Sequence, residues 1–185
     1  MSEQRVRRAW AWAALGAGML LMGCATDPTR ERELTPAAVA ILDESARRTL
    51  TAFHEAAARA DEAAYFALLD DDAVFLGTDA SERWSKEAFR AYAHPAFAQG
   101  KGWTYRERAT NVRVTTDTAW FDQELVNEKY GTCRGTGVMR RRWSAADRRH
   151  VWRISQYSLS VPIPNEMLAD VARQIRENAA TAKTR

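Results

Sequence analysis

Residues 103–161 read WTYRERATNVRVTTDTAWFDQELVNEKYGTCRGTGVMRRRWSAADRRHVWRISQYSLSV and carry the clearest structural pattern in the chain. Valine, threonine, tyrosine and tryptophan are frequent there, and apolar and polar side chains largely alternate, which is typical of half-buried strands. Short turn segments divide the stretch into four strands, expected at residues 103–115, 118–129, 132–143 and 150–161. Because each connection is short, the pattern predicts a four-stranded antiparallel meander.

The residues before this stretch show helical spacing instead. Thr35-Pro36 is a favourable helix start, and the apolar residues that follow recur every three or four positions: Val39, Leu42, Ala46, Leu50, Phe53 and Ala57. Shorter helices are expected at residues 62–69 and 85–98, the second interrupted at His94-Pro95, with a short strand at 73–77 between them. Helices followed by a long curled sheet predict an α+β domain with the N-terminal helices packed in the concavity of the sheet.

Length and composition narrow the possible classes of protein. The chain has 185 residues, 46% of them hydrophobic and 28% charged, which fits one domain with a full core and excludes wholesale disorder. Two cysteines are too few for a disulfide framework or a cysteine-rich zinc site.

The N-terminus has the features of a secretory signal. Arg5, Arg7 and Arg8 precede an apolar run of about 15 residues that ends at Cys24, shorter than the roughly 20 residues of a membrane-spanning helix. Leu21-Met22-Gly23-Cys24 resembles a bacterial lipobox, which implies cleavage before Cys24 and attachment of lipid to that residue. The alternatives are a plain cleavable signal or an uncleaved anchor, in which Cys24 is incidental.

This interpretation divides the chain into a signal peptide (1–23), a lipidated cysteine with its tether (24–34), a folded domain (35–167) and a C-terminal helix and tail (168–185). Cleavage would lower the formal net charge from +3 to +1, so the basic precursor gives no case for nucleic-acid binding. We expect a protein of the cell envelope, anchored by lipid and facing the periplasm. Ala25 after the modified cysteine favours the outer membrane.

Several short motifs occur in a distinctive order: Ala73-Val74-Phe75-Leu76-Gly77, Ala119-Trp120-Phe121-Asp122, Arg134-Gly135-Thr136-Gly137 and Trp152-Arg153-Ile154. Together they resemble the SnoaL-like branch of the nuclear transport factor 2-like proteins over about residues 46–167. The resemblance implies a cone-shaped α+β half-barrel with a pocket at its open end, commonly paired as a homodimer through the sheet. Members of the family include isomerases, dehydratases and cyclases, and also non-catalytic binding modules, so the fold alone does not settle the function.

Strand alternation suggests a polar spot inside the pocket. If Trp120 faces inward, Asp122 and Glu124 do too, and either carboxylate is a candidate catalytic base with Arg134 beside it. The alternative is a structural ion pair between neighbouring strands. The candidate ligand-binding residues are Tyr65, Trp84, Trp103, Trp120, Arg134, Gln156 and Ser158.

Other patterns point away from metals and nucleotides. No two of the three histidines have metal-ligand spacing, and no glycine-rich phosphate loop occurs, so we expect no metal and no cofactor. Six arginines within residues 140–153 suit a solvated turn or, more specifically, a contact with anionic lipid headgroups. The favoured function is the binding of a small, partly apolar ligand. The alternatives are a cofactor-free lyase, isomerase or hydrolase, and a non-catalytic dimeric interaction module.

Overall fold

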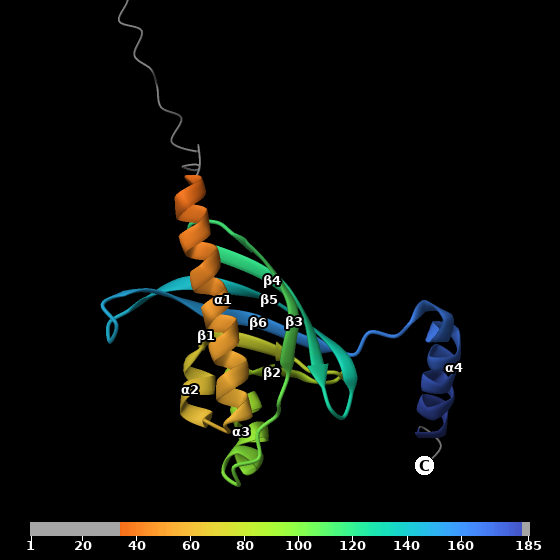
Figure 1. The fold of residues 1–185 in the computed structure, drawn as a ribbon. Helices are drawn as coiled ribbons and strands as arrows, with labels where there is room; N and C mark the ends of the chain where they lie inside the picture. Colours follow the sequence, from red (N-terminus) through yellow and green to blue (C-terminus); the bar gives the residue numbers. More distant parts are fainter. Residues whose placement is uncertain (1–33, 183–185) are drawn as a thin grey trace, which may run out of the picture. The chain divides into compact units, whose positions relative to one another are not determined.

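The computed structural model describes residues 34–182, so the predicted signal peptide, Cys24 and most of the tether lie outside the described residues. One curved, unclosed sheet of six strands and four helices form a mixed α+β fold, as predicted (Figure 1). The elements are α1 (Pro36–Ala58), α2 (Glu62–Ala67), β1 (Leu69–Leu76), β2 (Arg83–Ser85), α3 (Lys86–Phe97), β3 (Arg106–Val114), β4 (Thr118–Asn127), β5 (Gly131–Ser144), β6 (Arg149–Ser160) and α4 (Asn165–Ala182). Within residues 34–182, no helix is both long enough and apolar enough to span a bilayer.

The sheet contains the predicted meander and two further strands. Strands β3 to β6 pair antiparallel in chain order, which confirms the meander. On its far side β1 pairs parallel with β6, and β2 pairs antiparallel with β1, which gives the order β2-β1-β6-β5-β4-β3. The strand predicted at 73–77 begins earlier, at Leu69, because Leu69 already pairs with Ile154 of β6.

Helix α1 lies across one face of the sheet (Figure 1). The hydroxyl of Thr35 accepts a hydrogen bond from the Ala38 amide at 3.2 Å and caps the helix, as its sequence position suggests. The predicted apolar stripe is buried except for Val39, which is 38% exposed. The predicted break at His94-Pro95 is wrong. Helix α3 runs through Pro95 to Phe97, whose buried ring offsets the hydrogen bond that proline cannot donate.

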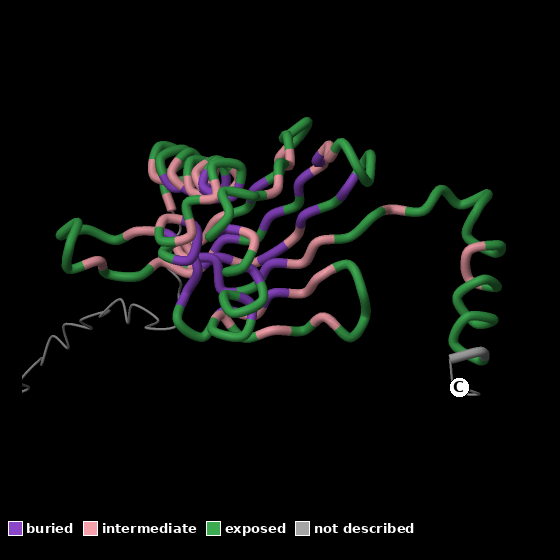
Figure 2. The backbone as a smooth tube through the Cα atoms, turned by 90° about the horizontal axis from the view of Figure 1, so that it is seen from below, coloured by how far each residue is buried: buried purple, intermediate pink, exposed green. Residues whose placement is uncertain are grey.

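The pairing of β6 with β5 is interrupted by one extra residue on β6. Met139 lies opposite Ile154, whereas Val138 lies opposite Gln156, so Ser155 is the extra residue of a β-bulge. Its hydroxyl donates to the carbonyl of Val138 at 3.1 Å. A bulge shifts the alternation by one residue. The core-facing residues of β6 are therefore even-numbered before the bulge and odd-numbered after it. Trp152 and Ile154 are buried before the bulge and Tyr157 is buried after it. Figure 2 shows that the buried segments lie along the strands of the sheet and the helices packed on it.

Strand β1 has a second irregularity, between Leu69 and Val74. The three aspartates in this interval each form an ion pair: Asp70 with Arg142 at 2.7 Å, Asp71 with Lys86 at 3.0 Å and Asp72 with Arg140 at 2.9 Å. Asp70 is buried, so its pairing with Arg142 supplies the hydrogen bonds that its carboxylate would otherwise lose. These pairs fasten β1 and α3 to the far end of β5.

Gly137 of β5 lies beside the bulge, where its backbone approaches the backbone of Gln156. A Cβ atom at this position would come within 2.1 Å of the Gln156 carbonyl oxygen and 2.7 Å of the Phe121 ring. We therefore expect Gly137→Ala to lower the free energy of unfolding by about 1–3 kcal/mol, because the backbone of β6 must move. Urea denaturation measures the change, with Thr136→Ala on the opposite face as the control. An unchanged midpoint for Gly137→Ala would contradict this account of the bulge.

Candidate functional site

A cavity of about 270 Å³ lies at the C-terminal end of α1, enclosed by α1, α2, α3, the start of the β1–β2 turn and the end of β6. The wall is strongly aromatic. All five tyrosines of the chain line it: Tyr65, Tyr92, Tyr105, Tyr130 and Tyr157. Phe53, Phe75, Phe89, Trp84 and Trp103 complete the ring of aromatic side chains. Such a wall suits a flat or alicyclic ligand that is bound by contact and by a few hydrogen bonds.

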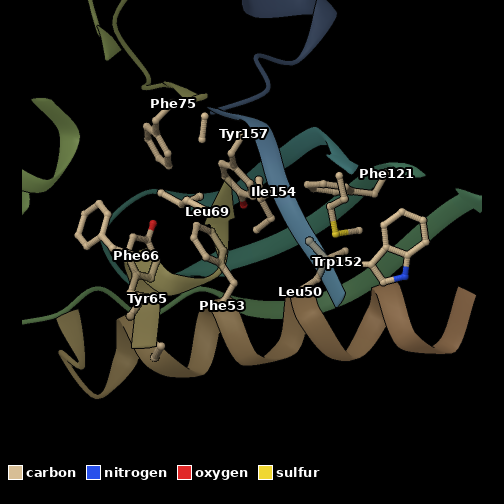
Figure 3. Packing of buried hydrophobic residues seen from close by; sticks show 14 of the residues in the cluster. Leu50, Phe53, Tyr65, Phe66, Leu69, Phe75, Phe121, Trp152, Ile154 and Tyr157 are labelled. Atoms are coloured by element: carbon tan, nitrogen blue, oxygen red, sulfur yellow. The ribbon is translucent and has the colours of Figure 1, made fainter. Parts of the chain in front are cut away.

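The inner wall is fixed by packing between elements far apart in the sequence. Phe53 of α1 stacks on Tyr65 of α2, with ring centroids 4.3 Å apart, and meets Tyr157 of β6 at 5.2 Å (Figure 3). Phe75 of β1 stacks on the other side of Tyr157 at 5.5 Å. Because these rings are buried against one another, the cavity is preformed.

Three of the phenols stay protonated over the physiological range. Burial raises the pKa of Tyr105 to about 12, and it raises the pKa values of Tyr65 and Tyr157 as well. Neutral phenols both donate and accept hydrogen bonds, so the tyrosines present donors to a ligand rather than negative charge.

His54 is the one histidine that lines this cavity. Its Nε2 lies 2.9 Å from Oε1 of Gln123, and Nε2 of Gln123 donates to the Thr110 hydroxyl at 3.0 Å. An amide oxygen only accepts, so Nε2 of His54 donates and Nδ1 of the neutral ring is left as the proton acceptor. Burial lowers the pKa of His54 below its ordinary value, which favours that neutral ring.

Glu82 is the carboxylate of the cavity wall. It belongs to the turn between β1 and β2, where its Oε2 accepts from the Asp79 amide at 3.1 Å. The carboxylate therefore holds the turn in shape and also contributes one negative charge at the cavity.

The structure brings together part of the predicted ligand site. Tyr65, Trp84 and Trp103 line the cavity, as expected. The inward orientation predicted for the other members is wrong, because they lie on the outer face of the sheet: Trp120, Arg134, Gln156 and Ser158. For Gln156 and Ser158 the cause is the bulge at Ser155, which exchanges the faces of the residues that follow it.

The two predicted catalytic carboxylates also face outward. Asp122 is exposed and accepts a hydrogen bond from the Asn111 amide at 3.0 Å. Glu124 lies opposite Arg134 in register but forms its ion pair with Arg108 at 2.8 Å. The inward face of β4 instead carries Ala119, Phe121, Gln123 and Leu125, all buried. Neither Asp122 nor Glu124 lines the cavity.

Sequence reasoning missed the most chemically active group in the wall. His54 follows Leu50 by four positions and Phe53 by one, so it lies on the flank of the buried stripe, a signal that helical spacing does contain. Tyr157 follows the bulge, so uninterrupted alternation along β6 gives it the outward face, and Tyr130 and Tyr92 carried no signal, since both are exposed residues outside the strands. Over residues 34–182, no group of three or more potential ligand side chains is placed to hold a metal ion.

Comparison with known proteins agrees with this geometry. A family model described as the SnoaL-like domain matches residues 46–164. A nuclear transport factor 2-like protein from Pseudomonas putida KT2440 has a TM-score of 0.53 at 14% identity, covering 69% of this chain and 92% of that one. A cystatin-like fold protein from Burkholderia xenovorans LB400 also has a TM-score of 0.53, at 20% identity, covering 67% and 95%. No curated protein matches. The family match covers more than half of the chain, and so this protein belongs to the SnoaL-like domain family.

Proposed function

We propose that this protein is a lipid-anchored protein of the cell envelope whose SnoaL-like domain binds a small, partly apolar ligand in the aromatic cavity. The observation that carries the proposal is the gathering of all five tyrosines around one preformed cavity. A core needs no such arrangement, since phenylalanine would pack as well without hydroxyl groups to satisfy.

The wall also limits the charge of the ligand. Glu82 contributes a negative charge, His54 is neutral and the buried phenols are protonated. Among residues 34–182, no arginine or lysine lines the cavity, so an anionic group would lack a partner from this part of the chain. The ligand we propose is neutral, with an aromatic or alicyclic body and oxygen atoms that accept hydrogen bonds from tyrosine.

A second candidate function is cofactor-free acid–base catalysis, in a lyase, isomerase or hydrolase. One observation favours it: a neutral imidazole at the cavity, oriented by Gln123 and Thr110. In this version His54 takes the part of the general base that we predicted for Asp122 or Glu124, and a phenol such as Tyr157 donates to the developing negative charge.

The proposed anchor rests on the sequence from Leu21 to Cys24 and on the apolar run before it. Each methylene of a buried acyl chain contributes about 0.8 kcal/mol, so several chains would hold the domain at a membrane almost permanently. The outer membrane is the proposed destination.

We further propose a homodimer through the outer face of the sheet. Trp120 is 49% exposed there and lies in one row with Val138 and Gln156, and the next row holds Asp122, Thr136 and Ser158. Arg113 lies opposite Trp120 on β3, so the patch pairs one exposed aromatic ring with charged neighbours at its edge. An exposed tryptophan in such a setting suits an interface, and a single sheet needs both faces covered.

Filling the cavity entrance tests ligand binding. Thr78 is exposed and lines the entrance, so Thr78→Trp should obstruct it without disturbing the core. Small molecules co-purified with the full chain, extracted and identified by mass spectrometry, should fall about tenfold or more in Thr78→Trp. Thr136→Trp, on the outer face, should retain them. Equal retention by Thr78→Trp would show that the cavity is not the site.

The two cysteines provide a matched test of the anchor. Intact-mass measurement of the native protein should find Cys24 as the acylated N-terminus, and membrane fractionation should find the protein in the pellet. Cys24→Ser should abolish the modification, whereas Cys133→Ser should leave it unchanged, because Cys133 is buried within β5. An unmodified Cys24, or an intact residue 1, refutes the proposal.

The neutral state of His54 has a measurable consequence for stability. Burial holds the pKa of His54 in the folded protein below the ordinary histidine value of 6.5, so the unfolded chain binds more protons as the pH falls through this interval. The wild type should therefore lose stability between pH 6.5 and the lower folded pKa, whereas His54→Gln cannot show this loss. Denaturation series at several pH values compare the two proteins, and parallel pH profiles would be inconsistent with a buried neutral His54.

Replacing Trp120 tests the dimer. Trp120→Glu places a charge in the centre of the proposed interface and should yield a monomer at micromolar concentration. Light scattering of the chain from residue 25 onward measures the mass, with Trp143→Glu as control, since Trp143 is also an exposed tryptophan but lies in the β5–β6 hairpin. A monomeric wild type, or a dimer that survives Trp120→Glu, would rule the interface out.

A further inference from the structure

The β5–β6 hairpin extends past the neighbouring strands and carries six arginines (Figure 1). We call residues 140–153 the arginine hairpin. Three of its arginines are engaged with the rest of the domain: Arg140 with Asp72, Arg142 with Asp70, and Arg141 through a 3.0 Å hydrogen bond to the carbonyl of Thr116. These contacts hold the base of the hairpin in place, so its tip projects from a rigid support.

Of the remaining three arginines, Arg148 and Arg149 lie toward the tip of the hairpin, whereas Arg153 lies opposite Arg140 and interacts electrostatically with Asp71. Among the ion pairs of residues 34–182, none involves Arg148, Arg149 or Arg153. The carboxylates nearby are already bound within their own turns: Asp147 accepts from the Ser144 hydroxyl at 2.7 Å, and Asp117 accepts from Thr115 and Thr118. Lys86 is paired with Asp71. The tip therefore presents a net positive surface.

An aromatic side chain accompanies this charge. Trp143 is 61% exposed, and its ring meets that of His150 edge to face, with centroids 5.3 Å apart. Tryptophan beside arginine is favoured at the boundary between lipid and water, because the indole is apolar with one polar hydrogen-bond donor. No packing role within the domain explains this exposed ring, since the core cluster does not include it.

The hairpin lies at the end of the sheet where the chain enters the domain. The β3–β4 turn joins the base of the hairpin, through the hydrogen bond from the Arg141 amide to the Asp117 carbonyl at 2.7 Å. The same turn lies beside the N-terminal part of α1 (Figure 1). Along α1, Trp152 lies beyond Leu50 in the direction away from Phe53 and the cavity (Figure 3). The arginine hairpin and the first described residues thus share one end of the sheet, and the cavity lies toward the other.

We propose that the arginine hairpin docks on the surface of a bilayer that contains anionic lipid and orients the domain with its cavity away from the membrane. The inference rests on the proposed anchor at Cys24. The ten residues from Ala25 to Leu34 span at most about 36 Å, so an anchored domain stays within reach of the headgroups. Docking of the hairpin would also fix the orientation of the domain relative to the membrane.

A bilayer fits better than an acidic protein or a nucleic acid for a geometric reason. The charged tip, the exposed tryptophan and the point of chain entry occupy one end, so a single planar surface can meet all three. The mature chain carries a net charge near +1, so it has no general affinity for polyanions.

A fluorescent probe at the hairpin tip tests the proposal on the full, acylated chain. The probe is an environment-sensitive dye on Ala146→Cys, an exposed turn residue; Cys133 is buried and Cys24 is blocked by its modification. The chain is reconstituted in vesicles of phosphatidylcholine alone and in vesicles that also contain phosphatidylglycerol. Brominated acyl chains should quench the probe in the second case only, and added salt should reverse the quenching.

Charge reversal gives the size of the effect. An arginine near an anionic surface contributes about 1 kcal/mol, so Arg148→Glu with Arg149→Glu should lower the ratio of docked to undocked domain roughly 25-fold or more. The matched control is Arg83→Glu with Arg106→Glu, which makes the same change of net charge at exposed, unpaired edge-strand positions. The control should dock as the wild type does.

The possible outcomes distinguish the docking proposal from the proposal of a lipid anchor. A chain that fails to float with phosphatidylcholine vesicles contradicts the anchor, whereas equal quenching in both kinds of vesicle contradicts the docking. Quenching by phosphatidylglycerol without flotation on phosphatidylcholine upholds the docking alone. A probe that responds to soluble polyglutamate but not to phosphatidylglycerol vesicles would identify a protein-docking surface and overturn the proposal.

Discussion

The extra residue at Ser155 determines which side chains of β6 face the cavity and which lie on the outer face of the sheet. Up to Ile154 the chain of β6 follows one alternation, and after the bulge it follows the other. The exchange turns Tyr157 toward Phe53 and Phe75 and leaves Gln156 and Ser158 on the outer face. Without it, a phenol and a leucine of the cavity wall would face outward, and two polar side chains would face the core at a cost of a few kcal/mol each. Gly137 is the complementary feature, since its missing Cβ leaves room for the displaced carbonyl of Gln156.

The helices and the meander could be predicted from the sequence because both rest on a regular repeat. The stripe from Leu42 to Ala57 and the strands of the meander all appear in the structure. The pairing of β1 with β6 could not be predicted, because Asp70-Asp71-Asp72 resembles the end of a helix, and the ion pairs that stabilise these aspartates come from residues distant in the sequence. Three of the seven predicted ligand-binding residues line the cavity and neither predicted catalytic carboxylate does, because alternation alone does not give the inward face. Strand β4 carries aromatic residues on both faces, Trp120 outward and Phe121 inward, so alternation gives two sets of residues without saying which set is inside.

Basic side chains are absent from the described cavity wall and gather at the hairpin. Phenol hydroxyl groups, a neutral imidazole and the single carboxylate of Glu82 line the cavity, whereas several arginines and aspartates pair near the base of the β5–β6 hairpin. This separation follows from the sheet: its curvature encloses the rings at one end, and its long antiparallel pair leaves the other end open to water. The proposals for ligand binding and for membrane docking therefore concern different residues and can fail independently.

Because tyrosines lie close to two tryptophans of the cavity wall, the intrinsic fluorescence of the protein can report the binding of a ligand. Tyr92 stacks on Trp84 with centroids 4.9 Å apart, and Tyr65 meets Trp103 at 5.8 Å. At such separations light absorbed by the phenols passes readily to the indoles, whose emission responds to the polarity of the space in front of them. A molecule that displaces water from the cavity changes that emission, so compound collections can be screened against the unlabelled chain before any natural ligand is identified.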